Sequence, residues 1–250
     1  MHRRPVALIS GVGRKIGIGA GIVRKLSGDG WDLAVTYWPD YDKRMPWGVE
    51  PTSIPTLQDE LASLGARVVF LPADLQNAEA PAAVVKAAFE QLGSLSALIL
   101  SHCESVSSGI LNTTVDSFDR HFAVNARASW QLIREFALQV PAEGGSIVAL
   151  TSDATLFNMP YGASKGAMDR IVLAAARELA SLRIRANVVN PGPIDTGWMD
   201  EVTRDAIIDR QPTGRLGTPD DTANLIAFLL SPEGSWINGQ LLKSDGGFSA

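Results

Sequence analysis

Tyr161 and Lys165 stand four residues apart in the segment TSDATLFNMPYGASKG, residues 151–166. On a helix, this spacing places both side chains on one face. A phenol, with an ordinary pKa of about 10, is a poor acid or base at neutral pH. A nearby lysine ammonium stabilises the phenolate and lowers that pKa toward the range that general acid–base catalysis needs. The pair therefore predicts proton transfer, although an amphipathic helix shows the same spacing by chance.

Ser152 could hydrogen-bond a substrate carbonyl and the alkoxide that develops from it. It precedes Tyr161 by only nine residues, so the turn between them must be tight. If that turn holds the serine away from the site, Thr151, Asp153 or Thr155 takes its place. For Asp153 we favour the capping of a helix or turn, because a carboxylate beside a reacting carbonyl would be unusual.

The segment SGVGRKIGIGAG, residues 10–21, is rich in glycine and follows an apolar run. Glycines here would let the backbone approach a pyrophosphate, with the first amides of the next helix facing the anion. Ile16 stands where the third glycine of G-x-G-x-x-G belongs, so a tight strand-to-helix turn is an equally good interpretation. Arg14 and Lys15 add positive charge to this loop.

The elements that must position these residues are short apolar runs separated by segments of helical period. Most runs lack polar alternation, which is typical of strands buried on both faces of a parallel sheet. We expect a doubly wound α/β (Rossmann-type) fold, a single domain over residues 1–250, with helices on both faces. About seven strands are expected, at residues 5–10, 32–37, 67–71, 96–100, 145–151, 185–190 and 240–243.

Ligands of such folds bind beyond the carboxyl ends of the strands, which is where the candidate residues fall. Helices are expected from about residue 118 to 140 and over 171–182. The stretch 37–55 contains four prolines and two tryptophans. We expect it to be an irregular loop, functional or mobile, whose tryptophans either line an apolar pocket or pack under the prolines.

The composition excludes several classes of protein. The chain has 250 residues and a net charge of −5, which favours neither a nucleic-acid partner nor an anionic membrane surface. The single cysteine, Cys103, excludes an internal disulfide, and the three histidines show no metal-ligand spacing. The apolar run in MHRRPVALIS is too short for an export signal, and no stretch is long enough to span a membrane. A cytoplasmic location is expected.

Taken in order, these motifs resemble the short-chain dehydrogenase/reductase family over essentially the whole chain. Ser10-Gly11 and Gly17-Ile18-Gly19 match the first turn of that family, with two extra residues between the glycines. The segments FAVNARAS (122–129) and RANVVNPGPIDTGWM (185–199) match two further motifs. The resemblance implies a catalytic tetrad of Tyr161, Lys165, Ser152 and Asn125, with Asn125 supporting the lysine through a water.

The resemblance also implies a nicotinamide dinucleotide as cofactor. Asp74 and Leu75 would hold the adenine, although Asp74 could instead cap a helix entering at about Asn77. The implied cofactor contacts are Gly11, Arg14, Lys15, Gly17, Ile18, Gly19, Tyr37, Asp74, Leu75, Ser101, Lys165, Pro191, Gly192, Ile194 and Thr196.

The choice between the two dinucleotides follows from charge. The second expected strand ends at Tyr37-Trp38, without the aspartate that favours NAD(H) in this family. Arg14 and Lys15 suit the 2′-phosphate of NADP(H). We therefore expect NADP(H), with NAD(H) as the alternative.

One departure concerns the Asn-Asn-Ala-Gly motif of the family, which steadies the central sheet. Leu100-Ser101-His102-Cys103 stands there instead. Ser101 could replace one of the lost hydrogen bonds. His102 is expected to be structural, or part of the pocket wall, and Cys103 to be a packing residue.

The resemblance implies an oxidoreductase that acts on a ketone or secondary alcohol, similar to 3-oxoacyl-[acyl-carrier-protein] reductases in its C-terminal half. The partner would be a small carbonyl or alcohol substrate, and the assembly a dimer or tetramer of identical chains. Three alternatives stay open: an NAD-dependent alcohol dehydrogenase, an enoyl reductase, and a dinucleotide-binding sensor or partner protein without turnover.

Overall fold

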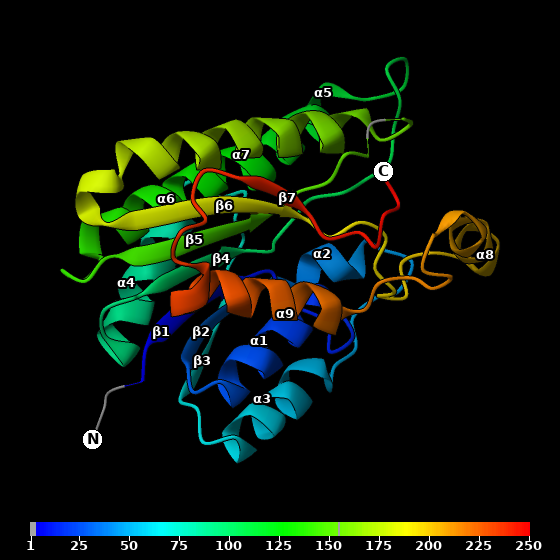
Figure 1. Cartoon of the computed structure of the whole chain (residues 1–250). Helices are drawn as coiled ribbons and strands as arrows, with labels where there is room; N and C mark the ends of the chain where they lie inside the picture. Colours follow the sequence, from blue (N-terminus) through cyan, green and yellow to red (C-terminus); the bar gives the residue numbers. More distant parts are fainter. Residues whose placement is uncertain (1–3, 155) are drawn as a thin grey trace.

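The computed structural model of the protein describes residues 4–154 and 156–250. Seven parallel strands form one sheet in the order β3-β2-β1-β4-β5-β6-β7 (Figure 1). All seven expected strands are confirmed, to within a residue at either end. They are β1 (Val6–Ser10), β2 (Asp32–Tyr37), β3 (Val68–Pro72), β4 (Ala97–Leu100), β5 (Gly145–Leu150), β6 (Ile184–Asn190) and β7 (Leu241–Lys243).

The strand order reverses on either side of β1, which pairs with both β2 and β4. Crossovers from this point run to opposite faces of the sheet, so a crevice opens at the carboxyl ends of these strands. β1 and β4 are buried along their whole length, as continuous apolar strands of a central parallel sheet must be.

Two layers of helices cover the sheet (Figure 1). On one face lie α4 (Ala80–Leu92), α6 (Ala128–Gln139) and α7 (Met159–Glu178). On the other face lie α1 (Ile18–Gly28), α3 (Ser53–Ser63) and α9 (Pro219–Leu230). Each layer closes its own apolar core against the sheet. No helix in the described part of the chain is long and apolar enough to cross a membrane.

The expectation of an irregular loop over residues 37–55 is wrong in part. The short helix α2 (Pro39–Lys43) follows β2, and α3 begins at Ser53. Pro39 and Pro55 lie in the first turns of these helices, where a helix does not need the missing N–H donor. The chain between them remains irregular.

The single helix expected from residue 118 to 140 is also interrupted. It consists of α5 (Val115–His121), a π-helical turn (Phe122–Arg127) and α6. A π turn holds one more residue than an α turn and leaves some carbonyls without their usual partner. Two of the residues in this turn, Val124 and Asn125, take part in the hydrogen bonding that fixes the site.

Candidate active site

A cavity of about 710 Å³ lies at the carboxyl ends of the strands. It brings together nearly all the residues predicted from the sequence. Those that line it are Gly11, Arg14, Gly17, Ile18, Gly19, Tyr37, Asp74, Leu75, Ser101, Ser152, Tyr161, Lys165, Pro191, Gly192, Ile194 and Thr196. Lys15 and Asn125 do not.

The glycine loop presents the start of α1 to the cavity. Gly17 precedes the helix without a side-chain cap, and its first turn contains no acidic residue. An uncapped N-terminus offers free amides to an anion. Gly11, at φ +79°, lies so close to the end of β4 that an added Cβ would stand 2.5 Å from His102 Cα. This donor set fits the pyrophosphate of a dinucleotide.

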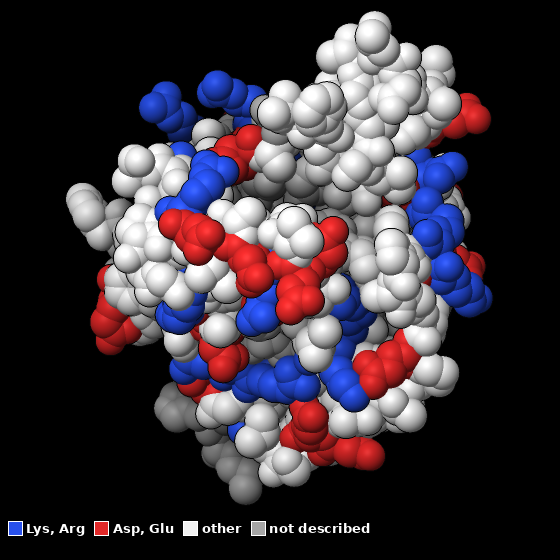
Figure 2. Space-filling model, turned by 90° about the vertical axis from the view of Figure 1, so that its right-hand side faces the viewer, with Lys and Arg blue, Asp and Glu red and all other residues white. Residues whose placement is uncertain are grey.

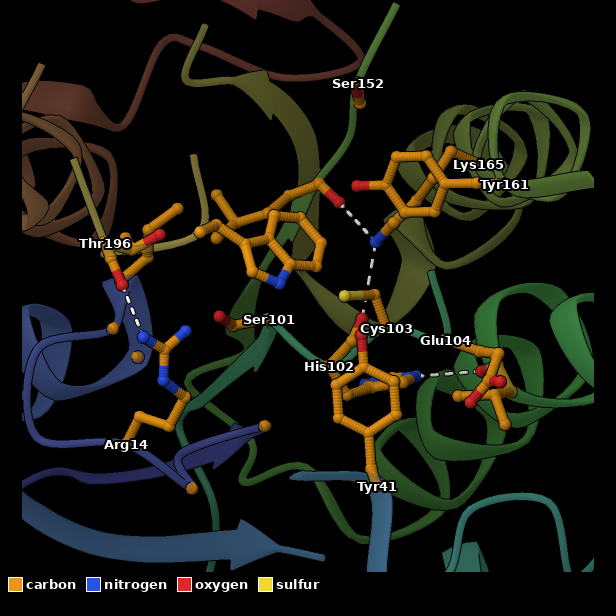
Figure 3. A pocket seen from close by; sticks show the side chains of 18 of the residues that line it. Arg14, Tyr41, Ser101, His102, Cys103, Glu104, Ser152, Tyr161, Lys165 and Thr196 are labelled. Carbon is orange, nitrogen blue, oxygen red and sulfur yellow. Dashed lines mark hydrogen bonds between the residues drawn. The ribbon is translucent and has the colours of Figure 1, made fainter. Parts of the chain in front are cut away.

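The two basic residues of the loop take different directions. Arg14 lines the cavity and donates to the Thr196 carbonyl at 2.5 Å (Figure 3). Its guanidinium lies over the Trp47 ring, 4.6 Å from the ring centroid. Burial lowers the pKa of Arg14. Lys15 is turned away, because its ammonium pairs with Glu50 at the surface. The structure therefore gives Lys15 no contact with the cavity.

At the adenine end, Asp74 forms a turn of its own. Its carboxylate accepts from the Gln76 N–H at 2.9 Å. The helix that follows, α4, begins at Ala80 with Glu79 preceding it. Asp74 is therefore not the helix cap that the sequence left open, and it lines the cavity beside Leu75.

At the other end, the phenol of Tyr161 points into the cavity from the first turn of α7 (Figure 3). Lys165 lies one turn later, with its Nζ 5.9 Å from the centre of the Tyr161 ring. The buried ammonium donates to the main-chain carbonyls of Leu150, at 2.8 Å, and His102, at 3.3 Å. Lys165 is thus fixed by the ends of β5 and β4.

The pKa of Tyr161 differs from the sequence prediction. Burial raises it, the nearby Cys103 adds to the rise, and hydrogen bonding to the Ser152 hydroxyl opposes it. Burial also lowers the pKa of Lys165. The expected lowering of the Tyr161 pKa is therefore wrong for this arrangement, since desolvation dominates. Tyr161 is protonated at neutral pH.

Ser152 lies in the same cavity as Tyr161, so the short turn does not remove it from the site. Of the alternatives to it, Asp153 pairs with Lys243 at 3.8 Å, with its side chain 63% exposed. Asp153 does not cap α7, because the residue that precedes this helix is Asn158; the turn-capping alternative stays a prediction. Thr155 lies outside the described residues.

Asn125, fully buried in the π turn, fixes the loop after β4. Its Oδ1 accepts from the Glu104 N–H at 2.8 Å. Its Nδ2 donates to the Glu104 carbonyl at 2.9 Å and to Ser164 Oγ at 2.8 Å. Among the described residues its side chain hydrogen-bonds these two and not Lys165. The predicted support of the lysine through a water stays a prediction.

His102 supplies what the missing asparagine motif was expected to supply. Its Nε2 donates to the Val124 carbonyl at 3.0 Å, and its Nδ1 accepts the Ser10 hydroxyl at 2.6 Å. The ring thereby joins the end of β1, the end of β4 and the π turn. Burial lowers the pKa of His102 to about 3, so the ring is neutral and structural, as expected. Burial raises the pKa of the neighbouring Cys103 thiol, which disfavours the reactive thiolate.

The chain after β2 contributes to the cavity. Both of its tryptophans, Trp38 and Trp47, line the cavity, which is one of the two alternatives expected for them, whereas the contributions of Tyr41 and Arg44 were not predicted. Trp47 packs against Trp198, with ring centres 5.4 Å apart. The richness of the stretch in tryptophan was the only signal available. Figure 2 shows that acidic and basic side chains are interspersed on this side of the molecule.

The protein matches known proteins over its whole length. Residues 11–249 match the family described as Enoyl-(Acyl carrier protein) reductase. The uncharacterized oxidoreductase YjdA of Bacillus subtilis is 36% identical over 97% of this chain and 96% of its own. Versicolorin reductase stcU of Emericella nidulans is 32% identical over 97% and 94%. The structure of a short-chain dehydrogenase from Burkholderia cenocepacia in complex with NADP has a TM-score of 0.87 at 31% identity, with both chains fully covered.

The sheet is parallel and doubly wound, and the glycine loop and the helix that carries Tyr161 and Lys165 line the same cavity. This combination defines a dinucleotide-dependent oxidoreductase. The chain belongs to the short-chain dehydrogenase/reductase family.

Proposed function

We propose that the protein transfers hydride between NADP(H) and a ketone or secondary alcohol, with Tyr161 as the general acid and base. One observation carries the proposal: Tyr161, Lys165 and Ser152 share a single cavity with the glycine loop and the uncapped start of α1. Proton transfer and dinucleotide binding therefore take place within reach of each other.

In the reductive direction, the chain supplies a proton and a polarised oxygen site. A bound nicotinamide would supply the hydride. Tyr161 is protonated at neutral pH, which is the form that gives a proton to a carbonyl oxygen. Ser152 donates to the same oxygen and stabilises the charge that develops on it. Lys165, held by two carbonyls and with its pKa lowered by burial, can return a proton to the phenolate.

The preference for NADP(H) rests on Arg14 and on the Burkholderia neighbour, whose structure contains NADP. Arg14 lies in the glycine loop just before the uncapped start of α1, and a guanidinium in this loop suits the additional 2′-phosphate of NADP(H). Asp42 acts against this preference, because its carboxylate lies against the glycine loop and repels a phosphate there. A Cβ added at Gly13 would stand only 2.6 Å from Asp42 Oδ2. NAD(H) is thus the competing cofactor, and titration with NADPH and NADH distinguishes the two.

Of the possible substrates, we retain 3-oxoacyl compounds as the initial candidates, on the similarity noted for the C-terminal half. An assembly of identical chains and a cytoplasmic location are also proposals. The exposed Trp130 and Leu138 of α6 support the first, because large apolar groups on an outer helix suit a contact between copies. Light scattering of the purified protein measures the assembly.

The Tyr161→Phe variant tests the function. We expect it to bind NADPH as the wild type does, followed by nicotinamide fluorescence, and to lose nearly all turnover of a carbonyl substrate. Phe118→Leu, a change on α5 outside the cavity, serves as the control. If Tyr161→Phe turns over as fast as the wild type, the catalytic assignment is wrong. If the wild type binds a dinucleotide but reduces no carbonyl, the sensor alternative is favoured.

A further inference from the structure

The chain from Trp38 to Gly48, here called the strap, connects the end of β2 to the stretch that leads into α3. Most of its side chains line the cavity, and these are Trp38, Asp40, Tyr41, Asp42, Arg44 and Trp47. The segments that these side chains contact show whether the strap is one wall of the cavity or a bridge across it.

On one side of the cavity, the strap contacts the loop after β4, which leads to α6. Arg44 donates two hydrogen bonds to the Glu104 carboxylate, at 3.0 and 2.8 Å. The Glu104 side chain is only 4% exposed, and its main chain is fixed by Asn125. The Tyr41 hydroxyl is hydrogen-bonded to the neighbouring Cys103. A bidentate pair with a buried carboxylate fixes orientation as well as position, so this contact holds the strap in one place.

On the other side, the strap contacts the glycine loop and the segment after β6. The Trp47 ring packs on Trp198, with 5.4 Å between ring centres, and the Arg14 guanidinium lies over the same Trp47 ring at 4.6 Å. The indole N–H of Trp47 donates to Asp42 at 2.8 Å, and Asp42 lies against Gly13. The chains after β1 and β6 lead to α1 and α9, on the opposite face of the sheet from α6. The strap therefore bridges the two sides of the crevice.

The cavity stays open beside the strap, with a volume of about 710 Å³. It is lined by Asp74 at the expected adenine end and by Tyr161 at the other end. A dinucleotide that fills this space lies between the strand ends and the strap, because the strap is attached to segments on both sides of it.

The strap can separate from these segments without opening a core. Between Val35 and Leu57, no described side chain belongs to either of the two apolar cores. Both ends of the strap are nevertheless fixed, since the Tyr37 carbonyl accepts from the Ala73 N–H at 3.0 Å and α3 packs on its core through Leu57. A segment that is tied at its ends and buries no apolar side chain between them opens at low cost.

We propose that the strap closes over the bound dinucleotide, and that the pair of Arg44 and Glu104 controls how fast the dinucleotide enters and leaves. While this pair is made, the strap spans the crevice, and the dinucleotide is exchanged only when the pair parts. This inference rests on the dinucleotide binding of the proposed function, and it adds a control of exchange at the same site.

Stopped-flow nicotinamide fluorescence tests the inference by measuring the association of NADPH and its dissociation into excess NADP⁺. Arg44→Ala removes the donor, whereas Glu104→Gln removes the charge and retains the main-chain bonds of the residue. We expect each variant to raise both rate constants about tenfold and to change Kd by less than about threefold, because opening lies on the path in both directions. The double variant should gain no more than either single variant, since all three lose the same contact.

Arg67→Ala is the matched control. Arg67 also pairs with a buried carboxylate, that of Asp32 at 2.7 Å, whose side chain is likewise 4% exposed. This pair lies at the amino ends of β2 and β3, outside the cavity, so neither rate constant should change.

Three results overturn the inference. A rise in the dissociation rate alone would make Arg44 a contact of the dinucleotide, and a rise in the association rate alone would make the strap an obstruction of the empty cavity. Rates equal to those of the wild type in both variants would leave the pair without any role in exchange. A wild type that binds neither NADPH nor NADH refutes the proposed function itself.

Discussion

Acidification should destabilise the protein through His102. The ring is 6% exposed, and both of its nitrogens are engaged, with Val124 and Ser10. Its pKa in the folded chain is about 3, against an ordinary value of 6.5. An added proton would occupy the nitrogen that accepts the Ser10 hydroxyl, and it would place a charge in a buried site near the ammonium of Lys165.

The direction in which stability changes with pH follows from this difference between the folded and unfolded pKa of His102. Above the unfolded pKa of 6.5, His102 is neutral in both states and has no effect on the pH dependence of stability. As the pH falls below that value, the unfolded chain binds a proton that the folded chain rejects, so the folded state loses stability. The loss grows until about pH 3, where the folded state also takes up the proton. At about pH 5 it amounts to about 2 kcal/mol, from about 1.4 kcal/mol for each pH unit below 6.5.

Urea unfolding of the wild type and of His102→Asn, each at about pH 7.5 and about pH 5, measures this loss. The asparagine retains polar atoms but cannot titrate, and the carboxylates common to both proteins cancel in the comparison. We expect the wild type to lose about 2 kcal/mol more than the variant between the two conditions. If both proteins lose the same free energy, His102 is not the buried neutral group described above.

Three further changes should alter stability, measured by thermal unfolding. Gly11→Ala should cost about 3 kcal/mol, because the residue sits at φ +79° and the new Cβ would lie 2.5 Å from a backbone atom; Gly28→Ala, with nothing within 4 Å, is its neutral control. Asn125→Ala should cost about 3 kcal/mol by leaving the buried N–H and carbonyl of Glu104 unpaired. Thr218→Ala should cost about 1 kcal/mol through loss of the capping box of α9. A cost below about 0.3 kcal/mol at any of the three would contradict the contact named for it.

The strands could be predicted because central parallel strands are continuous apolar runs, here rich in β-branched residues and placed between segments of helical period. The start of α3 was missed because Pro51 and Pro55 indicate a loop, whereas a first helical turn tolerates proline. The break in the helix expected over 118–140 has no signal in side-chain periodicity. In this turn the Val124 carbonyl accepts a hydrogen bond from His102, which lies in the loop after β4, far away in the sequence.

At the site, helical period fixed the common face of Tyr161 and Lys165, but the order of the motifs along the chain, not the spacing alone, singled out the pair. The direction of the Lys15 side chain could not be predicted, because it depends on the ion pair with Glu50, a residue far away in the sequence. The contact between Trp47 and Trp198 was equally hidden, because it joins segments far apart in the sequence. The rise in the Tyr161 pKa required knowledge of burial, which no local pattern supplies.

The π turn makes the length of the chain between α5 and α6 critical. Each residue of a helix advances by about 100°, and the π turn absorbs one extra residue by widening, so deleting one residue from 122–127 would restore a regular helix and leave the faces of α5 and α6 nearly unchanged. The deletion would instead displace Val124 and Asn125 from the positions in which they bond His102 and Glu104. Insertions and deletions should therefore be tolerated in the irregular stretch between α2 and α3 far better than in these six residues. In this protein a change of one residue in length can be more damaging than most changes of residue type.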